Sequence, residues 1–168
     1  TQSWKVANGA ITGTQDKPGN GGIVLTDRKY RNFEISLELN PDYGCDSGLF
    51  LRSNEKGEAY QVLLDYLDGG AIGGIYGERL KDVQGFVPPW REAWKNNAWN
   101  QLRARIEGDV PHIQVWLNGV KMTDWRDSAN HLPDGAKDGM IALQVHGGNR
   151  WYPGGMHRFR NIMLRELP

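Results

Sequence analysis

The chain has little with which to crosslink itself, span a membrane or attract a charged partner. Its single cysteine, Cys45, excludes an intramolecular disulfide and a cysteine-based metal cluster. Its 20 basic and 20 acidic residues cancel, so charge gives no reason to expect nucleic acid or an anionic membrane as a partner. No apolar run approaches the ~18 residues that a membrane helix needs.

Helix-forming stretches rich in Ala, Leu and Glu are also nearly absent, whereas 22 glycines and 7 tryptophans are present. Gly, Asn and Asp recur between short apolar runs, which indicates many tight turns. Tryptophans in such a setting either stack on sugar rings or fill the core, and by number alone packing in the core is favoured.

Alternation of apolar and polar residues with a period of two predicts many short strands. We expect strands at residues 3–6, 10–12, 22–26, 33–39, 47–52, 59–64, 71–76, 99–107, 112–117 and 120–123, and within 139–148 and 156–164. Asn8-Gly9 and Asn118-Gly119 are signals for two-residue hairpins. Without repeats, linkers or convincing amphipathic helices, residues 1–168 are predicted to form a single all-β sandwich domain.

Two segments break the strand pattern. Residues 77–97 carry Pro88-Pro89, Trp90 and Trp94 among charged residues, and a loop of ~20 residues without regular structure is usually functional or covering. The two tryptophans would either form a wall over a bound sugar or cover a sheet edge. Residues 124–137 are predicted to be a second polar loop with a short helical turn.

The last two predicted strands place hydrogen-bonding side chains opposite their apolar faces. Gln144 and His146 alternate with aliphatic residues in the first strand, and Arg158 and Arg160 share one face of the second. An amide, an imidazole and two guanidiniums are unusually dense for a plain solvated sheet. The pattern therefore predicts a polar ligand lying on a sheet, for which a sugar is the obvious candidate.

The same reasoning extends this face to three more strands. With the apolar residues of 47–52 in the core, Arg52 faces the other way, and Gln61 and Asp65 are expected to share its face. Tyr76 ends the next strand within reach. We hypothesise that the face lies on the concave sheet. The alternatives are an ion pair between Arg52 and Asp65, a solvated face for the two late arginines, and a structural role for the histidine.

Nine short motifs stand in order along the chain. They are W-K-V-A-N-G-A-I-T-G (4–13), Y-R-N-F-E-I-S-L-E (30–38), D-S-G-L-F-L-R-S (46–53), A-Y-Q-V-L-L-D (59–65), G-G-I-Y-G (73–77), A-W-N-Q-L-R (98–103), W-L-N-G (116–119), G-M-I-A-L-Q-V-H-G (139–147) and F-R-N-I-M-L-R-E-L (159–167). Together they resemble the 3-keto-disaccharide hydrolase domain family over essentially the whole chain. The resemblance implies a concanavalin-like jelly-roll sandwich of two antiparallel sheets. It also implies action on glycosides whose C3 hydroxyl has been oxidised to a ketone.

The chain departs from the family pattern at three places. Family members usually begin with a further strand that this sequence lacks, and an expected free sheet edge allows a homodimer by edge pairing. Asp46 stands where asparagine is frequent, and Ala59 stands where an acidic residue is frequent, with Glu58 one position earlier. A bacterial periplasmic or secreted location is our expectation.

The implied substrate suggests a mechanism of elimination followed by hydration. The ketone acidifies the C2 proton, which His146 would remove as the base. Arg52, Arg158 or Arg160 would stabilise the oxyanion, and Asp65 would orient the histidine or protonate the leaving oxygen. A divalent metal ion held by His146 and a carboxylate is an alternative to the arginine. The residues expected to bind substrate are Gln61, Tyr76, Gln144, Arg158, Arg160, Trp90 and Trp94.

Two other classes of function remain open on the sequence. A non-catalytic carbohydrate-binding module would use the same arginines, amides and aromatic rings. A lectin-like domain for protein partners would need a large exposed apolar patch, which the sequence does not show clearly. Ordinary glycoside hydrolysis needs two carboxylates, and the predicted face offers Asp65 with only Asp46 or Glu58 as a second.

Overall fold

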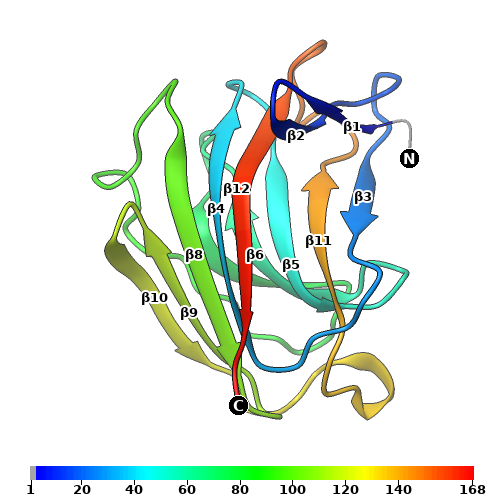
Figure 1. The fold of residues 1–168 in the computed structure, drawn as a ribbon, viewed down its shortest axis with the longest axis vertical. Coiled ribbons are helices and arrows are strands. Elements are labelled where there is room, and N and C mark those ends of the chain that lie inside the picture. Colours follow the sequence, from blue (N-terminus) through cyan, green and yellow to red (C-terminus); the bar gives the residue numbers. More distant parts are fainter. Residues whose placement is uncertain (1–2) are drawn as a thin grey trace.

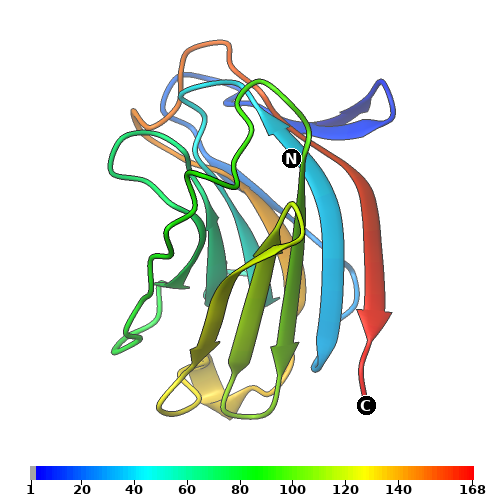
Figure 2. The same ribbon diagram turned by 90° about the vertical axis from the view of Figure 1, so that its left-hand side faces the viewer.

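The computed structural model describes residues 3–168, which form two antiparallel β-sheets packed face to face (Figure 1 and Figure 2). The larger sheet has seven strands in the order β1-β2-β12-β4-β8-β9-β10, and the smaller has five in the order β3-β11-β5-β6-β7. The all-β sandwich predicted from the alternation is confirmed.

The strands of the larger sheet are β1 (Trp4–Ala7), β2 (Ala10–Gly13), β12 (His157–Glu166), β4 (Phe33–Pro41), β8 (Asn100–Glu107), β9 (His112–Leu117) and β10 (Val120–Arg126). Those of the smaller sheet are β3 (Gly22–Leu25), β11 (Met140–Val145), β5 (Ser47–Ser53), β6 (Ala59–Leu64) and β7 (Ile72–Glu78). One short 3-10 helix, η1 (Pro133–Gly135), lies in the second polar loop. This loop begins later than predicted, because β10 continues past a bulge between Lys121 and Thr123.

The core lies between the sheets and follows the alternation in the sequence. In β4, Phe33, Ile35, Leu37 and Leu39 are buried, and the residues that alternate with them face outward. On the facing sheet, Leu49 and Leu51 of β5 are equally buried. Burial of a large apolar side chain stabilises the fold by about 1.5–3 kcal/mol. These inward positions therefore determine which residues of each strand face outward.

Both predicted hairpins are present. Asn8 and Gly9 have φ angles of 52° and 74°, and Asn118 and Gly119 have φ angles of 50° and 82°. A two-residue turn with two positive φ angles matches the twist of antiparallel strands, and Asn-Gly adopts it at low cost. These turns fix the registers of β1 with β2 and of β9 with β10.

The long loop after β7 covers part of the smaller sheet. The backbones of Phe86 and Ile75 exchange two hydrogen bonds of 2.9 and 3.1 Å at the edge of β7. Trp90 packs into the main core. Among residues 3–168, no helix is long and apolar enough to cross a membrane.

One end of the smaller sheet, uppermost in Figure 1, collects several strand termini. β11 and β6 end there, and β5 begins there. Residues 44–46 and 150–152 pair alongside this end through backbone hydrogen bonds, including Asp46 N to Arg150 O at 3.1 Å. This pairing brings two loops that are far apart in sequence to the edge of the sheet.

Candidate functional site

The outer face of the smaller sheet carries alternate residues of neighbouring strands. Phe50 of β5 lies opposite Ala142 of β11 and Gln61 of β6, and Gln61 lies opposite Tyr76 of β7. Because side chains alternate along a strand, Gln144 of β11 shares this face. The predicted grouping of Gln61, Tyr76 and Gln144 therefore matches the observed arrangement.

The same alternation continues past the strand ends and brings Asp46, Asp65 and His146 together, and Arg150 from a loop completes a charged cluster of four residues. Since Ser47 pairs with Leu64, Asp46 and Asp65 are neighbours just beyond that pair. The backbone N–H of His146 donates to the carbonyl oxygen of Asp46 at 3.3 Å. Three adjacent strands thus deliver a histidine and two carboxylates to one edge.

Arg150 contacts both carboxylates of the cluster. Its Nε lies 3.1 Å from Asp65 Oδ2, and its Nη2 also donates to that oxygen. Its Nε is 3.6 Å from Asp46 Oδ2. The hydrogen bond to Asp65 raises the pKa of the guanidinium, which keeps its charge. Its side chain is still 38% exposed, so it faces both the carboxylates and solvent.

The tautomer of His146 follows from its neighbour. Nδ1 lies 2.6 Å from the carbonyl oxygen of Gly147, and a carbonyl only accepts hydrogen bonds. Nδ1 therefore carries the proton in the neutral ring, and Nε2 has a free lone pair. Nε2 is 3.7 Å from Asp46 Oδ2, and the side chain is 39% exposed.

Asp46 is a carboxyl group poised to hold a proton. Burial raises its pKa to about 6, and the negative charge of Asp65 acts in the same direction. His146 and Arg150 oppose these effects without cancelling them. Its carboxyl group therefore changes protonation state near neutral pH, which an ordinary aspartate does not.

Asp65 is fully engaged as an acceptor. Oδ2 receives Arg150, and Oδ1 receives the backbone N–H of Leu67 at 3.0 Å. Gly70 leaves room for it, because a Cβ there would lie 2.6 Å from Oδ2. The predicted contact with His146 is replaced by one with Arg150, so Asp65 positions the guanidinium.

A groove of about 410 Å³ lies on the outer face, and its lining includes Val145 and Gly147, which flank His146 of the cluster in sequence. It is lined by Gly21, Gly22, Ile23, Phe50, Glu55, Lys56, Gly57, Glu78, Arg79, Gln144, Val145 and Gly147. Gln61 donates from Nε2 to Glu78 Oε2 at 2.8 Å and lies over Gly48, where a Cβ would come within 2.0 Å of Gln61 Oε1. Oε1 of Gln144 is buried and has no hydrogen-bond partner among residues 3–168.

The prediction that Arg52 belongs to this face is wrong. Arg52 is 1% exposed, and its φ of 55° turns it away from the strand alternation. It donates to the carbonyl oxygens of Arg31 and Gly108, each at 2.7 Å, and to Asn32 Oδ1 at 3.1 Å. The alternative of an ion pair with Asp65 is also wrong, because Asp65 pairs with Arg150. Arg52 joins loops at the other end of β5.

The prediction that Arg158 and Arg160 complete the same face is also wrong. Both lie on β12, in the larger sheet, and point outward on the opposite side of the sandwich. Arg158 pairs with Asp42 at 2.8 Å, and Arg160 pairs with Glu38 at 3.3 Å. Period-two alternation shows which residues of a strand share a face but does not show which sheet contains that strand.

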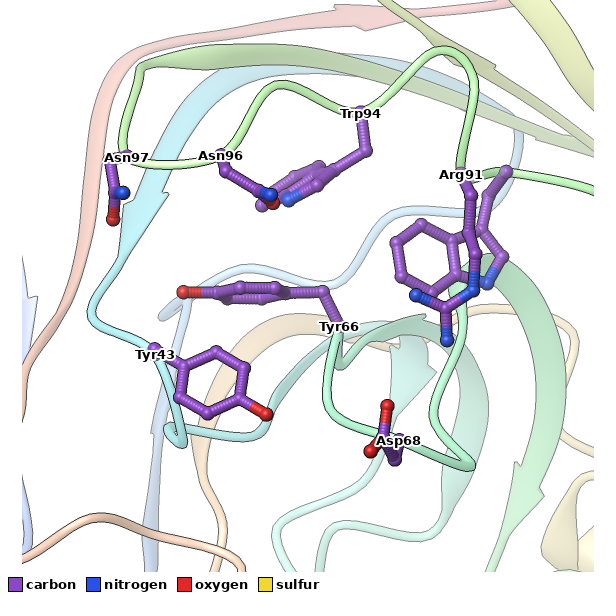
Figure 3. A pocket seen from close by; sticks show the side chains of 8 residues that line it. Tyr43, Tyr66, Asp68, Arg91, Trp94, Asn96 and Asn97 are labelled. Atoms are coloured by element: carbon purple, nitrogen blue, oxygen red, sulfur yellow. The ribbon is translucent and has the colours of Figure 1, made fainter.

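Trp90 and Trp94 lie on neither face. They line a separate pocket of about 390 Å³ (Figure 3). We call it the aromatic pocket; its lining residues are Tyr43, Tyr66, Asp68, Trp90, Arg91, Trp94, Asn96 and Asn97. Trp90 is also a core residue, and the wall over a bound sugar stays a prediction.

The charged cluster does not fit a divalent metal. No three His, Cys, Asp or Glu side chains converge as ligands within the part of the chain that the structure describes. Arg150 places a positive charge against both carboxylates, where a metal ion would have to bind. The cluster is therefore better suited to acid–base chemistry by its own side chains.

Arg150 was not predicted from the sequence, and Asp46 was named only as a second carboxylate beside Asp65. Arg150 lies in an irregular loop, so periodicity carries no signal for it. Its position depends on the backbone pairing with residues 44–46, which are about a hundred positions away. The D-S-G-L-F-L-R-S motif did contain Asp46, and extending the strand alternation one step would have placed it beside Asp65.

Comparisons with known proteins agree with this architecture. The profile of the 3-keto-alpha-glucoside-1,2-lyase-like domain matches residues 1–165. A 3-keto-disaccharide hydrolase from Bacteroides thetaiotaomicron is 22% identical over 210 residues, which cover 98% of this chain and 70% of the relative.

Two solved structures share the fold. A candidate glycosyl hydrolase from Parabacteroides distasonis superposes with a TM-score of 0.73 at 22% identity, over 99% of this chain and 91% of that chain. A carbohydrate-binding module from Bacillus subtilis gives a TM-score of 0.68 at 15% identity, over 97% and 91% of the two chains. These likenesses confirm the concanavalin-like sandwich.

Proposed function

This chain belongs to the family of 3-keto-alpha-glucoside-1,2-lyase-like domains, and we propose that it cleaves 3-keto-glycosides at the charged cluster by elimination and hydration. The observation that carries the proposal is the meeting of His146, Asp46 and Arg150 at the end of the smaller sheet, where Val145 and Gly147, on either side of the histidine, line a groove. These three side chains supply a base, an acid and a cation.

The reaction requires a base, an acid and a cation that stabilises the enolate. A ketone at C3 acidifies the C2–H bond, and a base removes that proton to leave an enolate. The enolate expels the C1 oxygen substituent, which takes a proton from an acid, and a C1=C2 double bond forms. Water then adds across this bond, with its oxygen on C1 and a proton on C2, so the sum is hydrolysis.

His146 is the proposed base. Its proton sits on Nδ1, held by the Gly147 carbonyl, so the free lone pair of Nε2 is available to the C2 proton. Histidine is the side chain that most often serves as a general base in enzymes. The glycines that follow it at the strand end leave room for a ligand to approach.

Asp46 is the proposed acid. Its pKa of about 6 lets it hold a proton that the leaving oxygen can take. Elimination removes groups from adjacent carbons, so the acid and base must lie close together. The 3.7 Å between Asp46 Oδ2 and His146 Nε2 meets this requirement.

Arg150 is the proposed partner of the ketone oxygen. Its two hydrogen bonds to Asp65 fix the guanidinium before substrate arrives, and its exposed part faces solvent. A well-aimed donor to a developing oxyanion lowers the activation barrier by about 3 kcal/mol. Arg150 thus takes the role that the sequence analysis gave to Arg52, Arg158 or Arg160.

Gln144, which lines the groove, and Gln61 and Tyr76 on the same face are proposed to bind sugar hydroxyls. The buried Oε1 of Gln144 lacks a donor, and an unpaired buried acceptor costs about 1–3 kcal/mol that a ligand hydroxyl would recover. Tyr76 exposes half of its surface beside Gln61.

A carbohydrate-binding module is the second candidate, favoured by the shared fold with the Bacillus subtilis module. A binding module has no need of a buried carboxyl with a raised pKa beside a neutral imidazole, whereas acid–base catalysis does. Ordinary glycoside hydrolysis needs two carboxylates that act on the substrate. It is disfavoured because the carboxylate of Asp65 already accepts hydrogen bonds from Arg150 and from the backbone N–H of Leu67.

The test is incubation with 3-keto-trehalose and methyl 3-keto-glucosides in deuterated water, with released sugar measured by mass spectrometry. The proposal expects release of sugar with deuterium at C2, loss of this release in His146→Gln, and no effect of a chelator. Free 3-keto-glucose incubated without protein corrects for spontaneous exchange. Saturable binding without release would make the protein a binding module.

A further inference from the structure

We propose that the aromatic pocket is a second sugar subsite, which holds the pyranose ring attached through the bond that is cleaved. The inference rests on the proposed function for the identity of that ring. It concerns a different cavity from the groove, since the two sets of lining residues do not overlap. Its occupant is a neutral pyranose.

The pocket combines aromatic rings held at fixed angles. Tyr66 lies between Tyr43 and Trp94, with ring centroids 5.5 and 5.1 Å away, as Figure 3 shows. Trp90 and Trp94 meet edge to face at 6.5 Å. Contacts to the core hold Tyr66, Trp90 and Trp94 in place, so a ligand would lose little entropy by ordering these three rings.

Tyr43 is the ring that faces solvent. It is 60% exposed although it touches the buried Tyr66. The apolar face of a pyranose would cover this exposed ring and remove apolar surface from water. The other rings are half-buried or buried and form the wall behind it.

Polar side chains around the aromatic rings could exchange hydrogen bonds with the hydroxyls of a pyranose. Asp68 accepts hydrogen bonds, Arg91 donates them, and Asn96 and Asn97 do both. The guanidinium of Arg91 lies over Trp90, 4.6 Å from the ring centroid, which holds its donors at the rim. One acidic and one basic side chain balance, so the pocket suits an uncharged ligand.

Two loops join this pocket to the charged cluster. The loop before β5 gives Tyr43 to the pocket and Asp46 to the cluster, three residues apart. The loop after β6 gives Tyr66 and Asp68 to the pocket and Asp65 to the cluster. A disaccharide likewise has two adjacent parts: one ring reacts, and the other is attached to the leaving oxygen.

The experiment compares two substrates on matched variants. Tyr43→Ala is expected to lower kcat/KM for a 3-keto-disaccharide about tenfold, the loss of one aromatic contact, and to leave methyl 3-keto-glucoside unchanged. Tyr43→Phe keeps the ring and is expected to retain activity on both. Tyr152→Ala removes an equally exposed tyrosine outside the pocket and serves as the control.

An equal loss on both substrates, or no loss on the disaccharide, would overturn the subsite. If the wild-type protein turns over neither substrate, the proposed function fails, and the pocket is tested by binding alone. Trehalose is then titrated against tryptophan fluorescence. A saturable change that Tyr43→Ala abolishes supports the subsite, and no change in the wild-type protein overturns it.

Discussion

Nε2 of His146 lies 3.7 Å from Oδ2 of Asp46, a separation too long for a hydrogen bond. The histidine donates its Nδ1 proton to the Gly147 carbonyl, and burial beside Asp65 lets the carboxyl group of Asp46 hold its proton up to about pH 6. One group can thus accept a proton while its neighbour can give one. This pair is the basis of the first two predictions.

Replacing His146 with glutamine should remove the base and preserve the shape of the site. We expect kcat to fall by about 10²- to 10⁴-fold, with KM changed little, because general-base catalysis contributes about that much. Steady-state kinetics on a 3-keto-glycoside would measure the change. A fall of less than threefold would show that another group removes the C2 proton.

Replacing Asp46 with asparagine should abolish activity and stabilise the fold at neutral pH. The pKa of Asp46 rises from 3.8 to about 6 on folding, so its protonated form is favoured in the native state. Its contribution to stability is full below pH 3.8 and is lost as the pH rises through 6. Asp46→Asn should therefore gain about 2 kcal/mol at pH 8 and nothing at pH 3.5.

Urea unfolding of both proteins at the two pH values would measure that difference. The two effects have a common cause, because the burial that destabilises the ionised carboxylate also makes it an acid. A variant that is less stable than the wild-type protein at pH 8 would contradict this account.

Arg150 and Asp65 should be energetically coupled. Arg150→Met leaves a nearly buried carboxylate without its cation, and we expect a loss of about 1–3 kcal/mol, given that the guanidinium is partly exposed. Asp65→Asn should cost less. In a double-mutant cycle, measured by thermal unfolding, the double variant should be more stable than the sum of the single losses implies. Strict additivity would show that the pair is not coupled.

Arg52 should matter for stability and not for catalysis. Arg52→Met removes donors from the carbonyls of Arg31 and Gly108 and from Asn32, and we expect a loss of about 3 kcal/mol. The folded fraction should keep its full kcat. Arg160→Gln, which breaks an ion pair on the larger sheet, should cost at most about 1 kcal/mol and serves as the comparison.

His157 should limit stability in acid. It is fully buried against Phe159, with ring centroids 4.5 Å apart, and burial lowers its pKa from 6.5 to about 3. Its contribution is therefore full above pH 6.5 and is lost as the pH falls toward 3. His157→Phe should reduce the stability lost between pH 7 and 4.5 by about 2–3 kcal/mol. Equal acid sensitivity of the variant and the wild-type protein, by urea unfolding, would contradict this.

The fold was predictable because its signals are local. Alternation along 33–39 and 99–107 predicts strands, since each apolar residue must face a core. Asn-Gly at two positions predicts hairpins, since few other dipeptides accept two positive φ angles. The end of β10 was missed because a bulge interrupts its alternation.

The site was predictable only in part. Gln61, Asp65, Gln144 and His146 were placed on one face because their strands are regular. Arg52 was misplaced because its positive φ breaks the alternation at the strand end. Arg158 and Arg160 were misplaced because a single strand does not reveal its sheet, and Arg150 was missed because only tertiary pairing positions it.

The order of strands in the smaller sheet has a consequence during synthesis. β11 lies between β3 and β5, so Gln144 pairs with Ile23 across more than a hundred residues of chain. Until β11 leaves the ribosome, the edges of β3 and β5 have no partner, and unpaired edges invite association with other chains. The charged cluster cannot form in a nascent chain that ends before residue 150. The site therefore forms only after both loops have been made, late in the synthesis of residues 1–168.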